Sequence, residues 1–176
     1  MKRPPSACFS LAPAAVVALL AGCADLNDTG LAALATRVPA YAIVNEQLVQ
    51  GEMTLFPDHT GTVTLRGQTM PSVGADGVAV AAPAPASKLV LSSCVGRLRY
   101  TATTMGNIDL RCNDGSVSDL RMALIGETRG YGYGQTATGL VSLTFGLGPV
   151  EARAHLTVPP NRQLVEGTDS SNLVLR

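Results

Sequence analysis

The stretch "CVGRLRYTATTMGNIDLRCNDGSVSDLRMAL", residues 94–124, decides the fold of this chain. Apolar and polar residues alternate along it, so that apolar residues such as Leu98 share one phase and charged residues occupy the other. The same period of two returns at 108–112 and at 120–124, and the turn-forming residues 113–115 separate these two runs. Alternation over short runs that are bounded by turn residues predicts half-buried strands, which favour antiparallel sheets with one face in water.

The alternation continues on both sides of this stretch. Short alternating runs flank a Pro/Asp/Gly cluster at 57–61, which is typical of a hairpin whose loop is longer than two residues. Residues 141–147 alternate again. In 150–158 the apolar positions keep a period of two, so we expect a strand there; a short helix that opens at Pro149 is the alternative.

These patterns predict an all-β chain with one domain. We expect a single antiparallel β-meander of about seven or eight strands, closed as a small barrel or folded as a sandwich. The patterns leave the choice between barrel and sandwich open. Outside an N-terminal signal peptide and tether, we expect little or no helix.

The N-terminus is typical of a secreted protein. Residues 1–3 are a short basic start, and 11–21 are almost wholly apolar. As a helix this run would reach about 16 Å, about half of the ~30 Å hydrocarbon core, which indicates a signal peptide rather than a membrane span. The run ends in the sequence LAGC at 20–23, which resembles the lipobox of bacterial lipoproteins. That resemblance implies cleavage before Cys23, acylation of this cysteine (with palmitate as a usual chain) and stable membrane anchoring.

Five segments follow from this interpretation. We expect a lipoprotein signal peptide over 1–22, a lipidated tether over 23–39 and a β-rich domain over 40–160. Inside that domain the Ala/Pro/Gly-rich segment 68–87 is expected to be a flexible loop. The last segment, 161–176, is polar and is expected to be a loosely ordered tail.

The residues after the lipobox indicate in which membrane the protein is anchored. In lipoproteins of this type, an aspartate directly after the lipidated cysteine tends to keep the protein in the inner membrane. Here Ala24 follows Cys23, and Asp25 comes one residue later. The resemblance therefore implies the outer membrane of a Gram-negative bacterium, on its periplasmic or its surface side.

A disulfide between Cys94 and Cys112 is expected, because both residues lie in the apolar phase and disulfides persist in the envelope. The turn chemistry argues against it. A turn centred on Gly106 would place Cys112 opposite Tyr100, about 20 Å along the strand from Cys94, beyond the ~7 Å between Cα atoms that a disulfide allows. The bridge therefore needs a turn centred nearer Thr103, a bulge, or strands that cross differently.

The glycine-rich stretch "RGYGYGQTATG", residues 129–139, spells G-x-G-x-x-A at 132–137. A phosphate-binding loop of this kind needs a helix N-terminus after it, because the helix end holds the anion. Here an alternating strand pattern follows, so we expect no cofactor. Strand alternation instead places Tyr131 and Tyr133 on one face and the glycines on the other, where they allow tight curvature or the close approach of another element.

The sequence contains little that points to catalysis. Lysine and arginine together number 13, as do aspartate and glutamate, so the basic excess expected of a nucleic-acid-binding protein is absent. The two histidines, His59 and His155, belong to no catalytic motif, and two cysteines without a nearby histidine do not complete a zinc site. We therefore expect no enzyme activity, no metal and no cofactor.

The arginines are the candidate binding residues. Four of them occupy the phase opposite the apolar face, and neighbouring strands would bring them into one basic stripe. Such a stripe would suit an anionic envelope component or an acidic protein partner. The alternative is a solvated face that is neutralised by nearby aspartates. The arginines are Arg97, Arg99, Arg111 and Arg121, and the aspartates are Asp109, Asp114 and Asp119.

Four short patterns beyond the lipobox are similar to those of small uncharacterised β-rich lipoproteins of Gram-negative bacteria. They are C-x-G-x-L-x-Y-T at 94–101, L-x-C-x-D-G at 110–115, R-G-x-G-x-G at 129–134 and L-T-F-G-L at 143–147. The resemblance implies a non-catalytic envelope lipoprotein with a binding or structural role. A periplasmic inhibitor of a hydrolase is the alternative, by analogy with lysozyme-inhibitor lipoproteins, although their tryptophan and Ser/Ala-rich inhibitory loop have no match here.

Overall fold

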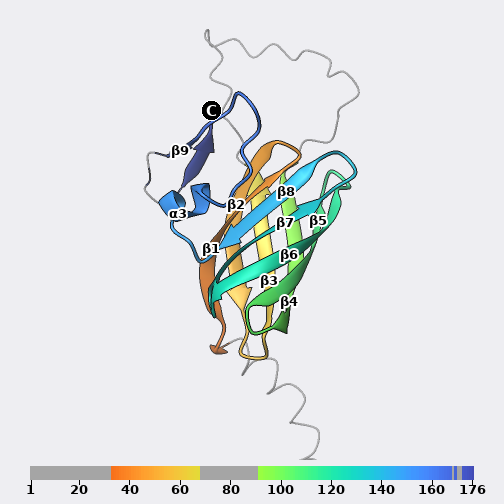
Figure 1. The fold of residues 1–176 in the computed structure, drawn as a ribbon, viewed down its shortest axis with the longest axis vertical. Helices are drawn as coiled ribbons and strands as arrows, with labels where there is room; N and C mark the ends of the chain where they lie inside the picture. The colour runs from red at the N-terminus through yellow and green to blue at the C-terminus, as the bar shows by residue number, and fades with distance from the viewer. Residues whose placement is uncertain (1–32, 68–90, 168, 170–171) are drawn as a thin grey trace, which may run out of the picture. The chain divides into compact units, whose positions relative to one another are not determined.

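The computed structural model describes residues 33–67, 91–167, 169 and 172–176. Eight antiparallel strands close into a barrel (Figure 1) in which each strand pairs with the next and β8 pairs with β1. The strands of the barrel are β1 (Thr36–Val44), β2 (Gln47–Leu55), β3 (Thr60–Gly67), β4 (Ser93–Ala102), β5 (Met105–Cys112), β6 (Val117–Gly126), β7 (Arg129–Gln135) and β8 (Leu140–Phe145).

The prediction of an all-β antiparallel meander is confirmed, and the architecture is a barrel rather than a sandwich. The first and last strands pair over residues 40–44 and 141–145, with Ala42 opposite Leu143. The hairpin expected around 57–61 is also confirmed, since β2 and β3 pair with Leu55 opposite Gly61. The expected signal peptide, the lipidated cysteine and the loop 68–87 lie outside the described residues.

The apolar phase of the strands fills the interior of the barrel. Large side chains from many strands are wholly buried there, among them Phe145, Met53, Leu65, Leu98, Ile108 and Leu110. The apolar faces predicted from alternation are therefore the inner faces, and the barrel is a packed core of the kind expected for about eight strands.

The barrel begins earlier than expected. The expected tether runs to residue 39, whereas β1 already starts at Thr36 and includes Pro39. The carbonyl of Pro39 accepts a hydrogen bond from the Gly146 amide, and regular pairing with β8 starts only at Ala40. A residue in an antiparallel strand turns its N–H and C=O to the same neighbouring strand. The missing N–H of Pro39 therefore removes at most one hydrogen bond to β8, at the end of the ladder.

The strand expected at 150–158 is wrong, and the alternative, a short helix that opens at Pro149, is confirmed: α3 (Pro149–Arg153) begins there and turns follow it. Proline stands at the first helical position, where its missing N–H costs nothing. The buried side chains are Ala152 and Leu156, which are four residues apart, while Val150 is 67% exposed. The buried residues therefore follow the spacing of a helix, although the apolar residues of the sequence also fit a period of two.

The tail expected to be loosely ordered contains a second sheet. Two short strands, β9 (Leu164–Glu166) and β10 (Leu173–Leu175), pair antiparallel with Val174 opposite Val165. Together with α3 they cover the outer face of the barrel near β1 and β2 (Figure 1). This second core outside the barrel includes Tyr41, Ile43, Leu48, Leu156, Leu164, Leu173 and Leu175.

The expected disulfide between Cys94 and Cys112 is confirmed. The two residues are direct partners in the β4–β5 ladder, with 4.0 Å between their Cα atoms. The ladder turns at 103–104, and an irregularity lies between Tyr100 and Ala102. The strand pair thus combines a turn near Thr103 with a bulge, and Gly106 stays inside β5 opposite Tyr100.

The turns divide between two ends of the barrel. Thr36 pairs with Leu55, so the chain begins β1 at the end that also carries the β2–β3, β4–β5 and β6–β7 turns. We call this the proximal end. The distal end carries the β1–β2, β5–β6 and β7–β8 turns, at 45–46, 113–116 and 136–139.

Candidate functional site

An open hollow lies at the distal end, with a volume of about 970 Å³. The three distal turns line it together with the segment that follows α3. The lining mixes polar side chains with exposed apolar ones, such as Val117 (54% exposed) and Leu140 (63% exposed). Sequence reasoning did not predict this hollow, because it assembles turns that are far apart along the chain.

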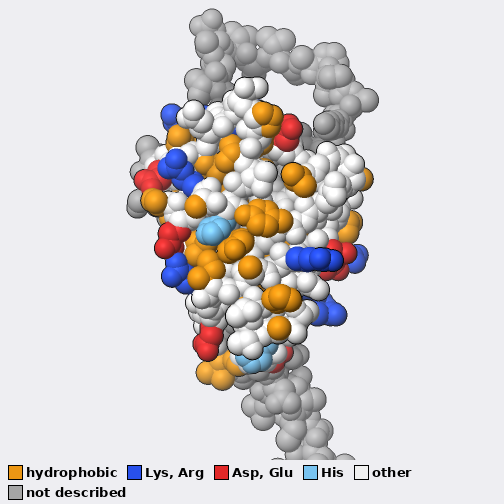
Figure 2. Space-filling view, viewed as in Figure 1, with side chains coloured by type: hydrophobic (Ala, Val, Ile, Leu, Met, Phe, Trp, Pro, Cys, Tyr) orange, Lys and Arg blue, Asp and Glu red, His pale blue; other side chains and the backbone are white. Residues whose placement is uncertain are grey.

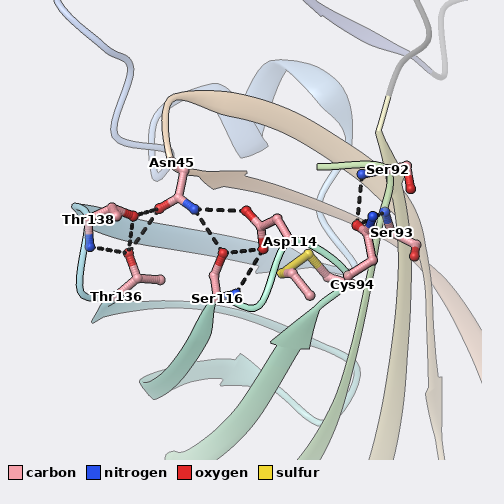
Figure 3. The surroundings of a disulfide bond; sticks show 10 residues. Asn45, Ser92, Ser93, Cys94, Asp114, Ser116, Thr136 and Thr138 are labelled. Carbon is pink, nitrogen blue, oxygen red and sulfur yellow. Dashed lines mark hydrogen bonds between the residues drawn. A yellow bond between two sulfur atoms is a disulfide. The ribbon is translucent and has the colours of Figure 1, made fainter. Parts of the chain in front are cut away.

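The side chain of Asn45 links the three distal turns (Figure 3). Its amide nitrogen donates to Asp114 Oδ2 at 3.1 Å and to Ser116 Oγ at 2.8 Å. Its amide oxygen accepts from Thr136 Oγ1 at 2.9 Å and from Thr138 Oγ1 at 2.5 Å. Both ends of the amide are therefore satisfied, and the network fixes the rim of the hollow.

Asp114 is held as a carboxylate in this network. Partial burial raises its pKa, but the hydrogen bonds from Ser116 and Asn45 together outweigh that effect and lower the pKa below its ordinary value. Both the hydroxyl and the backbone amide of Ser116 donate to Asp114 Oδ1. Among the three aspartates expected to neutralise the arginine stripe, Asp114 instead belongs to the distal hollow.

The disulfide stands beside this rim (Figure 3). The side-chain oxygen of Asn113 accepts hydrogen bonds from the backbone amides of Ser92 and Ser93, each at 2.9 Å. The covalent bond and these two hydrogen bonds tie the start of β4 to the β5–β6 turn. The distal end is therefore rigidly supported where β4 begins.

The four predicted arginines all point outward from β4, β5 and β6, and all four are exposed. We call this outer surface the arginine wall. In register, Arg99 lies opposite Asn107, which in turn lies opposite Arg121. Arg97 lies opposite Asp109, and Arg111 lies between Val95 and Val117. The structure thus brings the predicted residues together on three adjacent strands.

Two aspartates interrupt the arginine wall. Asp109 lies opposite both Arg97 and Asp119, and it forms an ion pair with Arg111 at 3.3 Å. These side chains are 69% and 48% exposed, so water screens the pair and it contributes little stability. The part of the wall nearer the proximal end, at Arg99 and Arg121, holds no carboxylate in the same row. Basic and acidic side chains also appear together at the right of Figure 2.

Residues 129–135 of the glycine-rich stretch form β7, and the expected alternation is confirmed. The glycines face the core: a Cβ on Gly132 would stand 2.2 Å from the sulfur of Met122. Tyr131 and Tyr133 face outward and meet edge to face, and Tyr131 stacks on His155 at 4.1 Å between ring centroids. Figure 2 shows hydrophobic side chains gathered where α3 meets the barrel. β7 therefore serves packing, and a turn rather than a helix N-terminus follows it.

The described part of the chain offers no group of three or more potential metal ligands. Of its two histidines, His59 lies near Tyr100 at the proximal end and His155 packs on Tyr131. Within the same residues no helix has the length and hydropathy to cross a membrane.

Sequence reasoning missed Asn45 as the residue that joins the distal turns. Its signal was present in "AIVNEQLV", residues 42–49, where Asn-Glu separates two apolar runs. Asparagine favours tight two-residue hairpin turns because it tolerates left-handed backbone. That signal predicts a turn, but only the closed barrel brings Asp114 and Thr136 within reach of the amide.

Comparison with known proteins yields little. No family model matches the chain, and no curated protein matches it. A solved structure of a redesigned beta barrel is similar to it, with a TM-score of 0.42 and 14% sequence identity, over 66% of this chain and 93% of that one. This similarity is too low to carry an argument about function.

Proposed function

We propose that this protein is a non-catalytic, lipid-anchored binding protein of the bacterial outer membrane, which uses its arginine wall to bind an anionic envelope component. The observation that supports the proposal is the gathering of four exposed arginines on three adjacent strands. A guanidinium presents several donors in a fixed plane, which suits phosphate and carboxylate groups.

The packed interior favours a ligand that binds outside the barrel. Side chains such as Phe145 and Met53 occupy the space that a ligand-carrying barrel leaves open. The disulfide and the continuous ladder give the wall a rigid base. A rigid, outward-facing charged surface suits recognition of a charged partner.

The anchor has its own test, in which cells that express the protein are labelled with palmitate. The wild type should take up label, and Cys23→Ser should lose it, because the thiol that would carry the lipid is gone. Cys94→Ala/Cys112→Ala is the matched control, which removes two other cysteines and should still label. Persistent labelling of Cys23→Ser would refute the anchor.

The arginine wall is tested in the Cys23→Ser background, so that binding to vesicles reports the wall alone. A basic side chain near an anionic surface contributes about 1 kcal/mol, so Arg97→Ser/Arg99→Ser should weaken binding to phosphatidylglycerol vesicles by about thirtyfold. The control Arg153→Ser/Arg162→Ser removes the same charge from exposed positions elsewhere and should have a much smaller effect. Equal effects of the two pairs would rule out a role specific to the wall.

A further inference from the structure

Two exposed hydrophobic side chains lie at the proximal end, beside the arginine wall. Met105 begins β5 and is 55% exposed, and Ile125, near the end of β6, is 54% exposed. Met105 pairs with Ala123, and Ile125 is two residues farther along β6. The two side chains therefore lie on neighbouring strands at one corner of the barrel. We call them the apolar tip.

The outer face changes character in steps from the apolar tip toward the distal end. Residues that pair across neighbouring strands form one row. The next row toward the distal end, after that of Met105 and Ala123, contains Asn107 and Arg121, with Arg99 beside them on β4. The row above that contains Arg97, Asp109 and Asp119 on the same three strands, so it carries two carboxylates and one guanidinium and is acidic on balance. Successive rows are two residues apart, about 6.6 Å along a strand. Apolar, basic and acidic side chains thus follow one another over about 13 Å.

This order matches a membrane surface. Amphipathic segments bury their apolar side chains about 5–10 Å into the boundary between headgroups and acyl chains. Arginines one row higher would lie at the level of the lipid phosphates, where the anionic surface attracts them. Carboxylates two rows higher would stand clear of that negative surface. A reversed order would oppose docking at this corner.

The start of the barrel is at the same end. β1 begins at Thr36, on the proximal end that carries the apolar tip. Residues 24–35 separate Cys23 from this strand, and twelve residues span at most about 43 Å when fully extended. A lipid on Cys23 would therefore hold the proximal end within reach of the membrane.

We propose that the proximal corner of the barrel docks on the phospholipid surface in which the protein is anchored. Met105 and Ile125 enter the boundary between headgroups and acyl chains, and Arg99 and Arg121 contact the lipid phosphates. This inference rests on the proposed lipid anchor, and it identifies the anionic partner of the arginine wall as the lipid headgroups. The distal hollow then faces away from the membrane.

Carboxylates at the proximal end that form no ion pair among the described residues, such as those of Glu127 and Asp58, oppose this docking. Glu127 lies in the turn after Ile125, where its backbone carbonyl accepts the Tyr100 hydroxyl at 2.7 Å, and Asp58 lies in the β2–β3 turn. Their repulsion from an anionic surface weakens docking without removing it. Glu127→Gln should therefore strengthen contact with the membrane, in the direction opposite to Arg121→Ser.

The chain contains no tryptophan, so a single introduced tryptophan reports its own surroundings. The full lipidated protein carries Met105→Trp, Ile125→Trp or, as the distal control, Leu140→Trp, whose native side chain is 63% exposed. Each variant is reconstituted into phosphatidylethanolamine/phosphatidylglycerol vesicles that contain brominated phospholipid. The measurements are flotation with the vesicles and quenching of tryptophan fluorescence.

The docking model expects all variants to float, with strong quenching at residues 105 and 125 and little at residue 140. Adding Arg99→Ser/Arg121→Ser to Met105→Trp should remove most of its quenching while flotation persists. Equal quenching at the three positions, or none, in floating protein would overturn the docking and leave the anchor intact. A wild-type protein that does not float would overturn the anchor, and with it the docking that depends on it.

Discussion

The β1–β2 turn holds two non-glycine residues, Asn45 (φ 49°) and Glu46 (φ 64°), in the left-handed region. A two-residue hairpin loop with positive φ at both positions is most often Asn-Gly. Asn45 has a reason to be there, since its side chain joins the distal turns. Among the described residues, the Glu46 side chain forms no hydrogen bond or ion pair that would offset its backbone strain.

Replacing Glu46 with glycine should therefore stabilise the barrel. Left-handed backbone costs a residue with a Cβ about 1–2 kcal/mol, and part of the relief is lost to glycine's freedom in the unfolded chain, so the net gain is about 0.5–1 kcal/mol. Urea denaturation measures the free energy of unfolding. The matched change Asn45→Gly should instead lower it by about 1 kcal/mol or more, because it breaks the hydrogen-bond network. If both changes act in the same direction, this account of the turn is wrong.

Asp114 should make stability depend on pH in the acid range. Its pKa is lower in the folded chain than in the unfolded one, where it is about 3.8. A carboxyl of this kind contributes stability that is fully present above the unfolded pKa and is lost as the pH falls through the folded pKa. The free energy of unfolding of wild type minus that of Asp114→Asn should therefore be positive at pH 7 and shrink as the pH falls below about 4. A difference that stays constant over this range would contradict the role of the carboxylate.

The strands of the barrel were predictable because each presents one face to the core, and a period of two records that fact directly. At α3 the period of two favoured a strand over the helix that opens at Pro149, because the residues alternate by chance while Ala152 and Leu156, four positions apart, make the buried contacts. The turn of the β4–β5 hairpin was equally ambiguous. Gly106 is the better turn residue by composition, yet it lies inside β5, where a Cβ would approach the carbonyl of Arg99 at 3.0 Å.

Any side chain at the central glycine of β7 should destabilise the barrel. A Cβ on Gly132 would stand 2.4 Å from the carbonyl oxygen of Arg121 as well as against Met122, so the backbone of a neighbouring strand has to move. Gly132→Ala should lower the free energy of unfolding by about 1–3 kcal/mol. Gly139→Ala is the control, since nothing lies within 4 Å of its Cβ position, and it should change stability by about 0.5 kcal/mol or less. Similar effects at both sites would refute the packing explanation.

The alternation of apolar and polar residues predicts neither the closure of the barrel nor its second core. The β1–β8 pairing and the packing of β9 and β10 on the outer face both join segments that are about a hundred residues apart along the chain. Tyr41 and Ile43 are the sequence signal of the second core. They are apolar residues at outward-facing positions of β1, where a solvent-exposed face would be polar. The arginine wall was predictable because each arginine follows strand phase. The distal hollow was not predictable, because turn residues show no regular alternation.

The second core should be a working part of the fold. Leu173 is wholly buried in it, and its backbone amide donates to Gln50 Oε1 on β2 at 3.2 Å. Leu173→Ala should lower the free energy of unfolding by about 2–5 kcal/mol, the usual cost of truncating a buried leucine. Val150→Ala, at a 67% exposed position of α3, should cost about 0.5 kcal/mol or less. Urea denaturation followed by circular dichroism compares the two. A loosely held tail would make both changes equally small, whereas a large loss at Leu173 alone places the last residues of the chain in the cooperative unit of the barrel.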